Sequence, residues 1–140
     1  MDKPISPGLK IAFLIHGIVG LVFGLAYLLI PQTAADLTNI SLQGGEPWLR
    51  LVGAAILGFT ASSWLGYMAH GWHDVKIVVQ AEMLWTFLAA VLILWFTLNG
   101  TWPALGWVNF IIMALFFVAF TYFYWREETV PLPTAGPATR

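Results

Sequence analysis

The sequence predicts an all-α integral membrane protein, an antiparallel up-down-up-down bundle of four transmembrane helices. Its composition is the first reason: of 140 residues, 59% are hydrophobic and 9% are charged, whereas roughly a quarter of an ordinary soluble domain is charged. So short and apolar a chain has too little polar surface to cover a core in water. A lipid bilayer is the solvent that suits it.

Four apolar stretches are the second reason, since each reaches the roughly 20 residues that a helix needs to cross hydrocarbon. We expect spans at residues 9–30, 47–69, 75–98 and 103–125. Pro31 follows the first stretch, Pro47 suits the first turn of the second, and Asn99-Gly100 ends the third with a turn signal. The later connections are short, so helices that follow each other should be antiparallel neighbours.

These spans define one domain, residues 1–128, with a loop at 31–46 as its one sizeable connection. The first stretch is too long for a signal peptide and is expected to be retained. After Trp125, the charged run Arg126–Glu128 should return to water. The remaining segment, residues 129–140, is rich in proline and is expected to be disordered.

Lysine and arginine residues predict the orientation. With four spans, one side of the membrane carries Lys3, Lys10, Lys76, Arg126 and Arg140. The other side carries a single cation, Arg50. Positively charged loops favour the cytoplasm, so both termini are expected there, in a multi-pass protein of the inner (plasma) membrane.

Small residues form rows on the first two spans, and membrane helices associate where such residues let backbones approach. The rows are Gly17, Gly20 and Gly24 on the first span and Ala54, Gly58, Ser62 and Gly66 on the second. We expect the rows to face each other inside the bundle or to face a partner protein.

Two readily ionisable side chains lie deep in the predicted spans, His16 and Glu82. Each follows a lysine of the predicted cytoplasmic side by six residues, which places both about 9 Å inside the membrane. Charges at that depth are unfavourable and usually pair within the protein. We therefore expect a hydrogen bond between them across the bundle, with Thr86 on the same face as Glu82.

Three roles remain open for this polar pair. It can fix the register of the helices, form a ligand or proton site, or face a partner protein. On the fourth span, Asn109 is expected to point inward. At the start of the second span, Glu46 and Arg50 stand at i and i+4, which predicts an ion pair, with Arg50 also a candidate contact for an anion.

The sequence predicts no cofactor and no metal site, and it has no cysteine. A bound lipid is expected, and His16 beside Gly17 is also a candidate axial ligand for the magnesium of a pigment. The net charge of −1 gives no reason to expect a nucleic acid. Phosphate-binding glycine loops, HExxH and nucleophile-elbow motifs are missing from the sequence, so no enzyme is predicted.

Three segments carry a resemblance to a known group: "LKIAFLIHGIVGLVFGLAYLLIP", "WLRLVGAAILGFTASSWLGY" and "LGWVNFIIMALFFVAFTYF". They resemble small four-helix membrane proteins of the DoxX-like group, over roughly residues 9–125. The resemblance implies four membrane helices and a role in respiratory or thiol-linked membrane complexes. Because the chain lacks cysteine, a thiol-redox role does not carry over.

Two functions follow from these observations. The first is a non-catalytic accessory or structural subunit of a larger respiratory, photosynthetic or transport complex. The expected protein partners are other membrane subunits or the chain itself. The alternative is a small oligomeric transporter or ligand-binding membrane protein with a proton-linked site at His16 and Glu82. Beyond Thr86 the third span offers only apolar side chains until Thr97, which favours the subunit.

Overall fold

A computed structural model of the chain describes residues 3–38 and 40–130. Its helices are α1 (Pro7–Leu29), α2 (Pro31–Thr38), α3 (Glu46–Met68), α4 (Trp72–Leu98) and α5 (Leu105–Thr129). All but α2 are long and apolar enough to cross a membrane, with mean hydropathies of 1.4 to 2.3. Within these residues, the predicted all-helical class with four long apolar helices is confirmed. The expected disorder of the tail falls, from residue 131 on, outside the described residues.

Local signals explain where the long helices begin and end. Ser6 caps α1, accepting a hydrogen bond from the backbone N–H of Leu9, and Pro7 fills the first helical position. After α4 the chain turns at Gly100, whose φ of 75° favours glycine. The last helix, α5, continues to Thr129, four residues beyond the expected end at Trp125.

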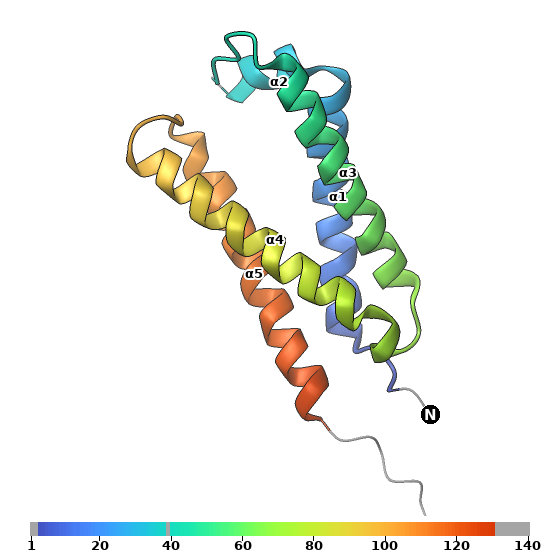
Figure 1. Cartoon of the computed structure of the whole chain (residues 1–140). Helices are drawn as coiled ribbons and strands as arrows, with labels where there is room; N and C mark the ends of the chain where they lie inside the picture. The colour runs from blue at the N-terminus through green and yellow to red at the C-terminus, as the bar shows by residue number, and fades with distance from the viewer. Residues whose placement is uncertain (1–2, 39, 131–140) are drawn as a thin grey trace, which may run out of the picture.

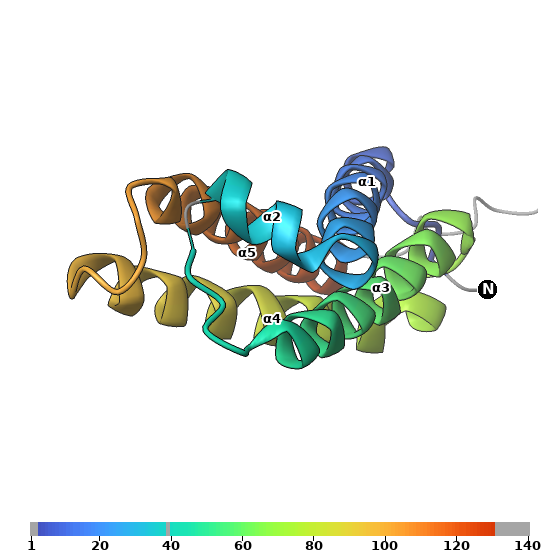
Figure 2. The same cartoon turned by 90° about the horizontal axis from the view of Figure 1, so that it is seen from above.

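The connection predicted as a loop at 31–46 contains a short helix, α2, and in this respect the prediction was incomplete. Gln32 donates a side-chain hydrogen bond to Asp36, one turn along the helix, and the Thr38 hydroxyl bonds back to the Ala34 carbonyl. Ala34 and Ala35 are buried, so α2 packs a small apolar face against the rest of the chain. Figure 2, in which α1 is seen nearly along its axis, shows α2 extending sideways from the end of that helix.

The long helices form two pairs, α1 with α3 and α4 with α5 (Figure 1). We call the end where α1 begins and α5 finishes the terminal end, and the opposite one the α2 end. The pairs meet at the terminal end and diverge toward the α2 end (Figure 1). The four helices therefore do not pack as one uniform bundle, and their up-down-up-down order across a membrane stays a prediction.

Close contact between α1 and α3 depends on glycines, as expected for α1 and in part for α3. A Cβ added at Gly24 would lie 3.2 Å from the Gly53 carbonyl oxygen, and one at Gly17 would touch Trp64. On α3 the tight position is Gly53, where an added Cβ would lie 2.7 Å from the Leu28 nitrogen.

The row expected on α3 therefore only partly faces α1. Gly66 does so, because an added Cβ there would meet the Phe13 ring. Ala54 is exposed, and nothing lies within 4 Å of a Cβ added at Gly58. Small residues at every fourth position drift around an α-helix of 3.6 residues per turn, so one row cannot stay against one straight partner.

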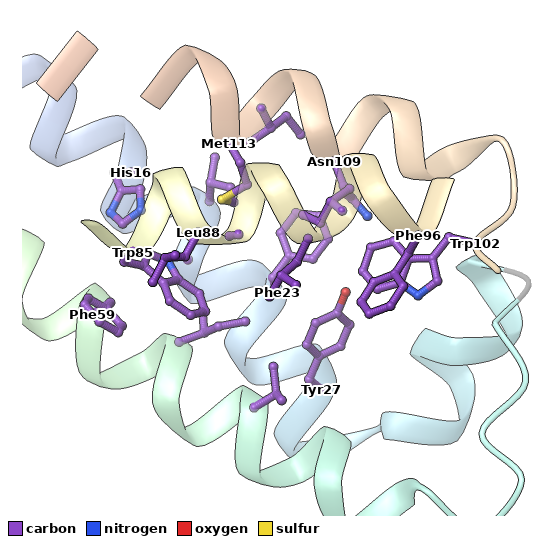
Figure 3. Close-up of a pocket in the computed structure, with 18 residues that line it drawn as sticks. His16, Phe23, Tyr27, Phe59, Trp85, Leu88, Phe96, Trp102, Asn109 and Met113 are labelled. Carbon is purple, nitrogen blue, oxygen red and sulfur yellow. The ribbon is translucent and has the colours of Figure 1, made fainter. Parts of the chain in front are cut away.

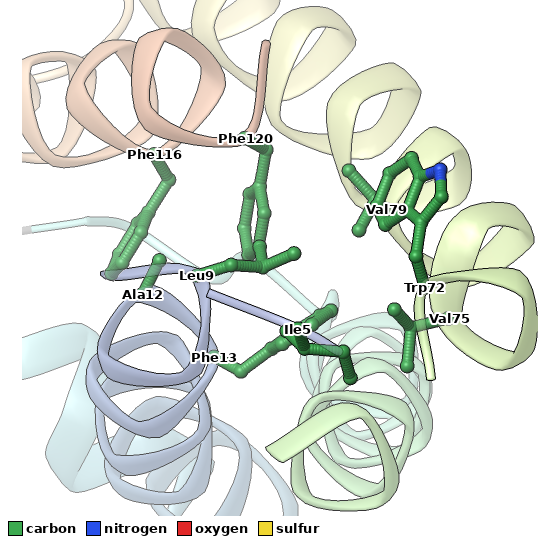
Figure 4. Packing of buried hydrophobic residues seen from close by; sticks show 9 residues of the cluster. All are labelled: Ile5, Leu9, Ala12, Phe13, Trp72, Val75, Val79, Phe116 and Phe120. Atoms are coloured by element: carbon green, nitrogen blue, oxygen red, sulfur yellow. The ribbon is translucent and has the colours of Figure 1, made fainter. Parts of the chain in front are cut away.

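The apolar core lies where the two pairs meet. Figure 4 shows its buried side chains, which come from the first halves of α1 and α4, the middle of α5 and the segment before α1. They are Ile5, Leu9, Ala12, Phe13, Trp72, Val75, Val79, Phe116 and Phe120. The core thus closes the terminal end of the protein.

Polar contacts reinforce the same end and correct one expectation. Glu127, predicted to be in water, is 4% exposed and pairs with Lys3 at 3.0 Å. Glu128 pairs with Lys76 at 2.6 Å and accepts a hydrogen bond from the Trp72 indole. We call these five residues the terminal clasp. Glu127 is buried because α5 runs past the predicted membrane boundary and meets the segment before α1, a tertiary contact that local sequence does not reveal.

Candidate functional site

A cavity of about 440 Å³ lies between the helix pairs, on the α2 side of the core (Figure 3). All four long helices contribute to its wall, which is almost entirely apolar and aromatic. The wall residues include Phe23, Phe59, Trp85, Leu88, Phe96, Trp102 and Met113. Its volume is within the usual range for small-molecule sites, roughly 300 to 1,000 Å³.

His16 stands at the end of this cavity that is nearest the core (Figure 3). The residue is 4% exposed, and its ring packs edge-on against the Phe116 and Phe120 rings, with centroids 4.7 and 5.5 Å away. The residue therefore belongs to both regions: it touches the core on one side and the cavity on the other.

The predicted partner of His16 is close, but a third residue bridges the two. Nδ1 of His16 lies 3.6 Å from Oε2 of Glu82, which is too long for a hydrogen bond. The Ser63 hydroxyl lies 2.8 Å from that Nδ1 and donates a hydrogen bond of 2.9 Å to Oε1 of Glu82. The expected pairing is thus a chain from His16 through Ser63 to Glu82, which we call the polar chain.

The surroundings of Glu82 leave one of its oxygens free. Glu82 is fully buried, and its Oε2 has no hydrogen-bond partner among the described residues. The Ser62 hydroxyl lies 2.9 Å from Oε1 but also 2.7 Å from the Phe59 carbonyl, and its single proton can serve one of them at a time. Of the two serines, Ser63 is therefore the one whose hydroxyl does not have a competing backbone acceptor for its hydrogen bond to the carboxyl group.

Two proton arrangements fit the same positions of the heavy atoms. If Ser63 donates to Glu82, the His16 Nδ1–H donates to Ser63, and Nε2 of the imidazole is free to accept. If Glu82 instead carries a proton and donates, Ser63 donates to Nδ1 and the imidazole proton is on Nε2. The second arrangement holds one proton more than the first, so passing from the first to the second takes up a proton at Nε2 on the cavity side and leaves one on Glu82.

Thr86 has a different role from the one its position suggested. It is fully buried on α4, as its spacing from Glu82 implies, but its hydroxyl donates to the backbone carbonyl of Glu82 at 2.6 Å. It therefore stabilises the helix backbone at Glu82. Both hydrogen bonds of the Thr86 hydroxyl within the described residues go to backbone carbonyls and not to the carboxyl group of Glu82. Sequence reasoning missed Ser63, for which the Ser62-Ser63 pair within an apolar span was the available signal.

Two further polar side chains line the cavity nearer the α2 end, Tyr27 of α1 and Asn109 of α5. Both reach toward the part of the cavity that Phe96 and Trp102 line (Figure 3). Neither has a hydrogen-bond partner within residues 3–38 and 40–130. Asn109 thus faces inward as predicted, but without a protein partner.

Arg50 lies at the α2 end and is half-exposed. Its guanidinium donates to Oε1 of Glu46 at 2.8 Å and to the Leu28 carbonyl at 2.5 Å. The first contact is the predicted ion pair, and the second satisfies a carbonyl in the last turn of α1. These contacts give Arg50 a structural role; contact with an anion stays a prediction.

A second, more open groove lies between α3 and α4 beside the cavity, and Phe59 lines both. Small and apolar residues line it: Ala55, Gly58, Phe59, Ser62, Ile77, Val78 and Ala81. Two residues of the predicted α3 row, Gly58 and Ser62, are thus on this groove and not on the contact with α1.

Comparison with protein-family models, curated proteins and solved structures finds no match for this chain. The fold and the cavity define its class: an all-helical protein with four candidate membrane-spanning helices and an apolar cavity between two helix pairs. Resemblance to the DoxX-like group stays a prediction. So does pigment ligation by His16, which visible absorbance of the purified protein would test.

Proposed function

We propose that this protein binds a lipophilic small molecule in the cavity between its helix pairs. The single observation that carries the proposal is an apolar cavity of about 440 Å³ that ends at a buried polar residue, His16. Ligand sites in proteins combine apolar walls with a few well-placed polar groups in this way. This function corresponds to the second of the two expected from the sequence, and the ligand would come from the membrane.

Binding is, in this proposal, linked to a proton. His16 lines the cavity through its ring, and Nδ1 connects it to Glu82 through Ser63. A ligand group bound at the imidazole changes which proton arrangement of the polar chain is favoured. Ionisable groups deep in a membrane protein are more often functional than incidental, which supports the same conclusion.

A matched pair of variants tests ligand binding. Ala89→Phe fills the cavity from α4, whereas Ala61→Phe adds the same ring to an exposed position of α3 outside both cavity and groove. In lipid nanodiscs, we expect wild type and Ala61→Phe to retain tritiated dodecanol above empty nanodiscs, and Ala89→Phe to lose most of that retention. Equal retention by all three proteins would refute the proposed site.

The proton link has its own measurement. Retention of dodecanol by the wild type should change with pH, and Glu82→Gln, which keeps the shape of the side chain, should flatten that profile. Glu46→Gln serves as the matched control, because it makes the same change at an exposed glutamate outside the cavity. An unchanged profile in Glu82→Gln would leave a binding site without a proton-linked function.

The groove beside α3 supports a second candidate function, the accessory subunit of a larger membrane complex. A Cβ added at Gly58 would meet nothing within 4 Å, so this small-residue surface is uncovered in the single chain. Small residues are where membrane helices associate most closely. The partner would be another membrane subunit or a second copy of this chain.

Particle size after gentle extraction from the native membrane separates these cases. A complex of fixed stoichiometry that Gly58→Leu disrupts, while Ala61→Leu does not, is the expected result for a subunit. A particle that contains a single chain and is unaffected by either substitution would exclude the function as an accessory subunit. Ligand binding and assembly use different surfaces, so both functions can hold together.

The cellular setting belongs to the proposal as well. We propose an inner-membrane protein whose terminal end faces the cytoplasm, since five of its six lysine and arginine residues fall on that side. The cavity would then lie toward the outer half of the membrane, and the polar chain toward the inner half. Cysteine labelling of Thr101→Cys and Ser6→Cys from either side of intact cells tests this orientation.

A further inference from the structure

The polar groups of the cavity lie at two levels, with apolar wall between them. Apart from the indole N–H groups of Trp85 and Trp102, the polar side chains that line it within the described residues are His16, Tyr27 and Asn109. His16 is at the core end, and the other two are nearer the α2 end (Figure 3). A ligand therefore meets hydrogen-bonding groups at two separate places.

Helix geometry sets the distance between these levels. Tyr27 follows His16 by 11 residues on the same helix, α1, which corresponds to about 16 Å along its axis. On α5, Phe116 marks the level of His16 because the two rings are in contact, and Asn109 precedes it by seven residues, or about 10 Å. The two polar levels are thus roughly 10 to 16 Å apart.

Each level has unused hydrogen-bonding capacity. When Ser63 donates to Glu82, Nε2 of His16 is an acceptor without a protein partner among the described residues, and it suits an O–H donor. Tyr27 and Asn109 together offer donors and acceptors, and neither has a partner within the described part of the chain. Polar groups left without a hydrogen bond beside apolar walls are unfavourable. A ligand that forms hydrogen bonds at both levels should therefore bind more tightly than a ligand that forms them at a single level.

We infer that the ligand is an elongated lipophile with a hydrogen-bonding group at each end. A hydroxyl or other O–H group lies at His16, an apolar chain passes Trp85 and Phe23, and a second polar group reaches Tyr27 and Asn109. This inference rests on the proposed function, since it specifies what occupies the same cavity. An ordinary membrane lipid chain, polar at one end, fits the cavity less well.

Three probes of equal chain length test the inference: dodecane, dodecanol, and dodecanediol with a hydroxyl at each end. Tritiated forms are bound to the full-length protein in nanodiscs, and each affinity is referred to the probe concentration in the bilayer. We expect the diol to bind about fivefold more tightly than dodecanol, as one added hydrogen bond implies. Dodecane should bind most weakly.

Two variants test whether Tyr27 and Asn109 give the diol its higher affinity. In the double variant Tyr27→Phe with Asn109→Leu, the diol and dodecanol should bind with nearly equal affinity. Tyr67→Phe, which changes a tyrosine outside the cavity, should keep the wild-type ratio. A diol that binds the wild type no better than dodecanol would overturn the inference, as would an advantage that persists in the double variant.

The outcomes also distinguish this inference from the proposed function. If no probe binds above empty nanodiscs, or if Ala89→Phe retains every probe, the cavity is not a ligand site and both proposals fail. If Ala89→Phe abolishes binding but diol and dodecanol bind alike in the wild type, the site stands and the two-ended ligand is rejected.

Discussion

The Ser63 hydroxyl lies 2.8 Å from Nδ1 of His16, although the two residues are 47 positions apart in the sequence. This contact joins α1 to α3, and through the hydrogen bond from Ser63 to Glu82 it continues to α4. The polar chain therefore connects three of the four long helices at the boundary between the core and the cavity. Any movement of one helix pair against the other changes these distances.

Removing the bridge should destabilise the protein. In Ser63→Ala, His16 and Glu82 lose their common partner in a buried site, and we expect a loss on the order of 1–2 kcal/mol, as for hydrogen bonds between membrane helices. Ser62→Ala should have a smaller effect, because that hydroxyl has an alternative acceptor on its own helix. Thermal unfolding in detergent measures both. Equal midpoints for the two variants would contradict a bridging role for Ser63.

Two glycines of α3 should respond in opposite ways to the same change. A Cβ added at Gly53 would lie 2.7 Å from the Leu28 nitrogen and 2.9 Å from the Gly24 carbonyl oxygen, both backbone atoms that cannot rotate away. Gly53→Ala should therefore separate α1 from α3 and lower stability by about 1–3 kcal/mol. Gly58→Ala meets no atom within 4 Å and should be neutral or slightly stabilising in the isolated chain. Thermal unfolding in detergent measures both variants. A Gly53→Ala variant as stable as the wild type would refute the predicted close contact.

The terminal clasp should protect the segment before α1. Glu127 pairs with Lys3 at 3.0 Å and accepts a hydrogen bond from the Ser6 N–H at 3.3 Å, so Glu127→Gln weakens a charge-assisted contact at a largely buried position. We expect faster hydrogen exchange at the Ile5 and Trp72 amides, which bond across to His70 and Lys3 in the same region.

Arg126→Gln is the matched control for the clasp. It removes a charge at the neighbouring position, where the side chain is exposed. Exchange at the Ile5 amide should stay at the wild-type rate in this variant. If both substitutions accelerate exchange equally, the effect comes from the charge of the α5 end and not from the clasp.

Arg50→Gln should have a small effect on stability. The ion pair with Glu46 is between side chains that are 44% and 48% exposed, and such pairs contribute about 0–1 kcal/mol. The hydrogen bond to the Leu28 carbonyl adds a helix-end contact of similar modest size. A large loss of unfolding temperature would mean that Arg50 supports more than the end of α1. A loss of anion binding with unchanged stability would instead support its predicted contact with an anion.

The sequence by itself determined the helical class and the positions of the four long helices. Apolar runs of sufficient length, bounded by Pro31, Gly45 and Asn99, leave few alternatives, because backbone groups in lipid must bond within a helix. It also singled out His16 and Glu82, since ionisable groups stand out against an apolar background. These features depend on local composition and spacing, which a single sequence records.

Tertiary structure alone decided how the helices pair and what lies between them. Ser63 and Gly53 acquire their roles from the rotation of α3 about its own axis, which a row of small residues does not specify. The burial of Glu127 and the cavity beside His16 depend on two helix pairs that meet at one end and diverge at the other. Such an arrangement arises from contacts between residues far apart in the sequence. The hydropathy of a single helix is compatible with many different arrangements of the four helices.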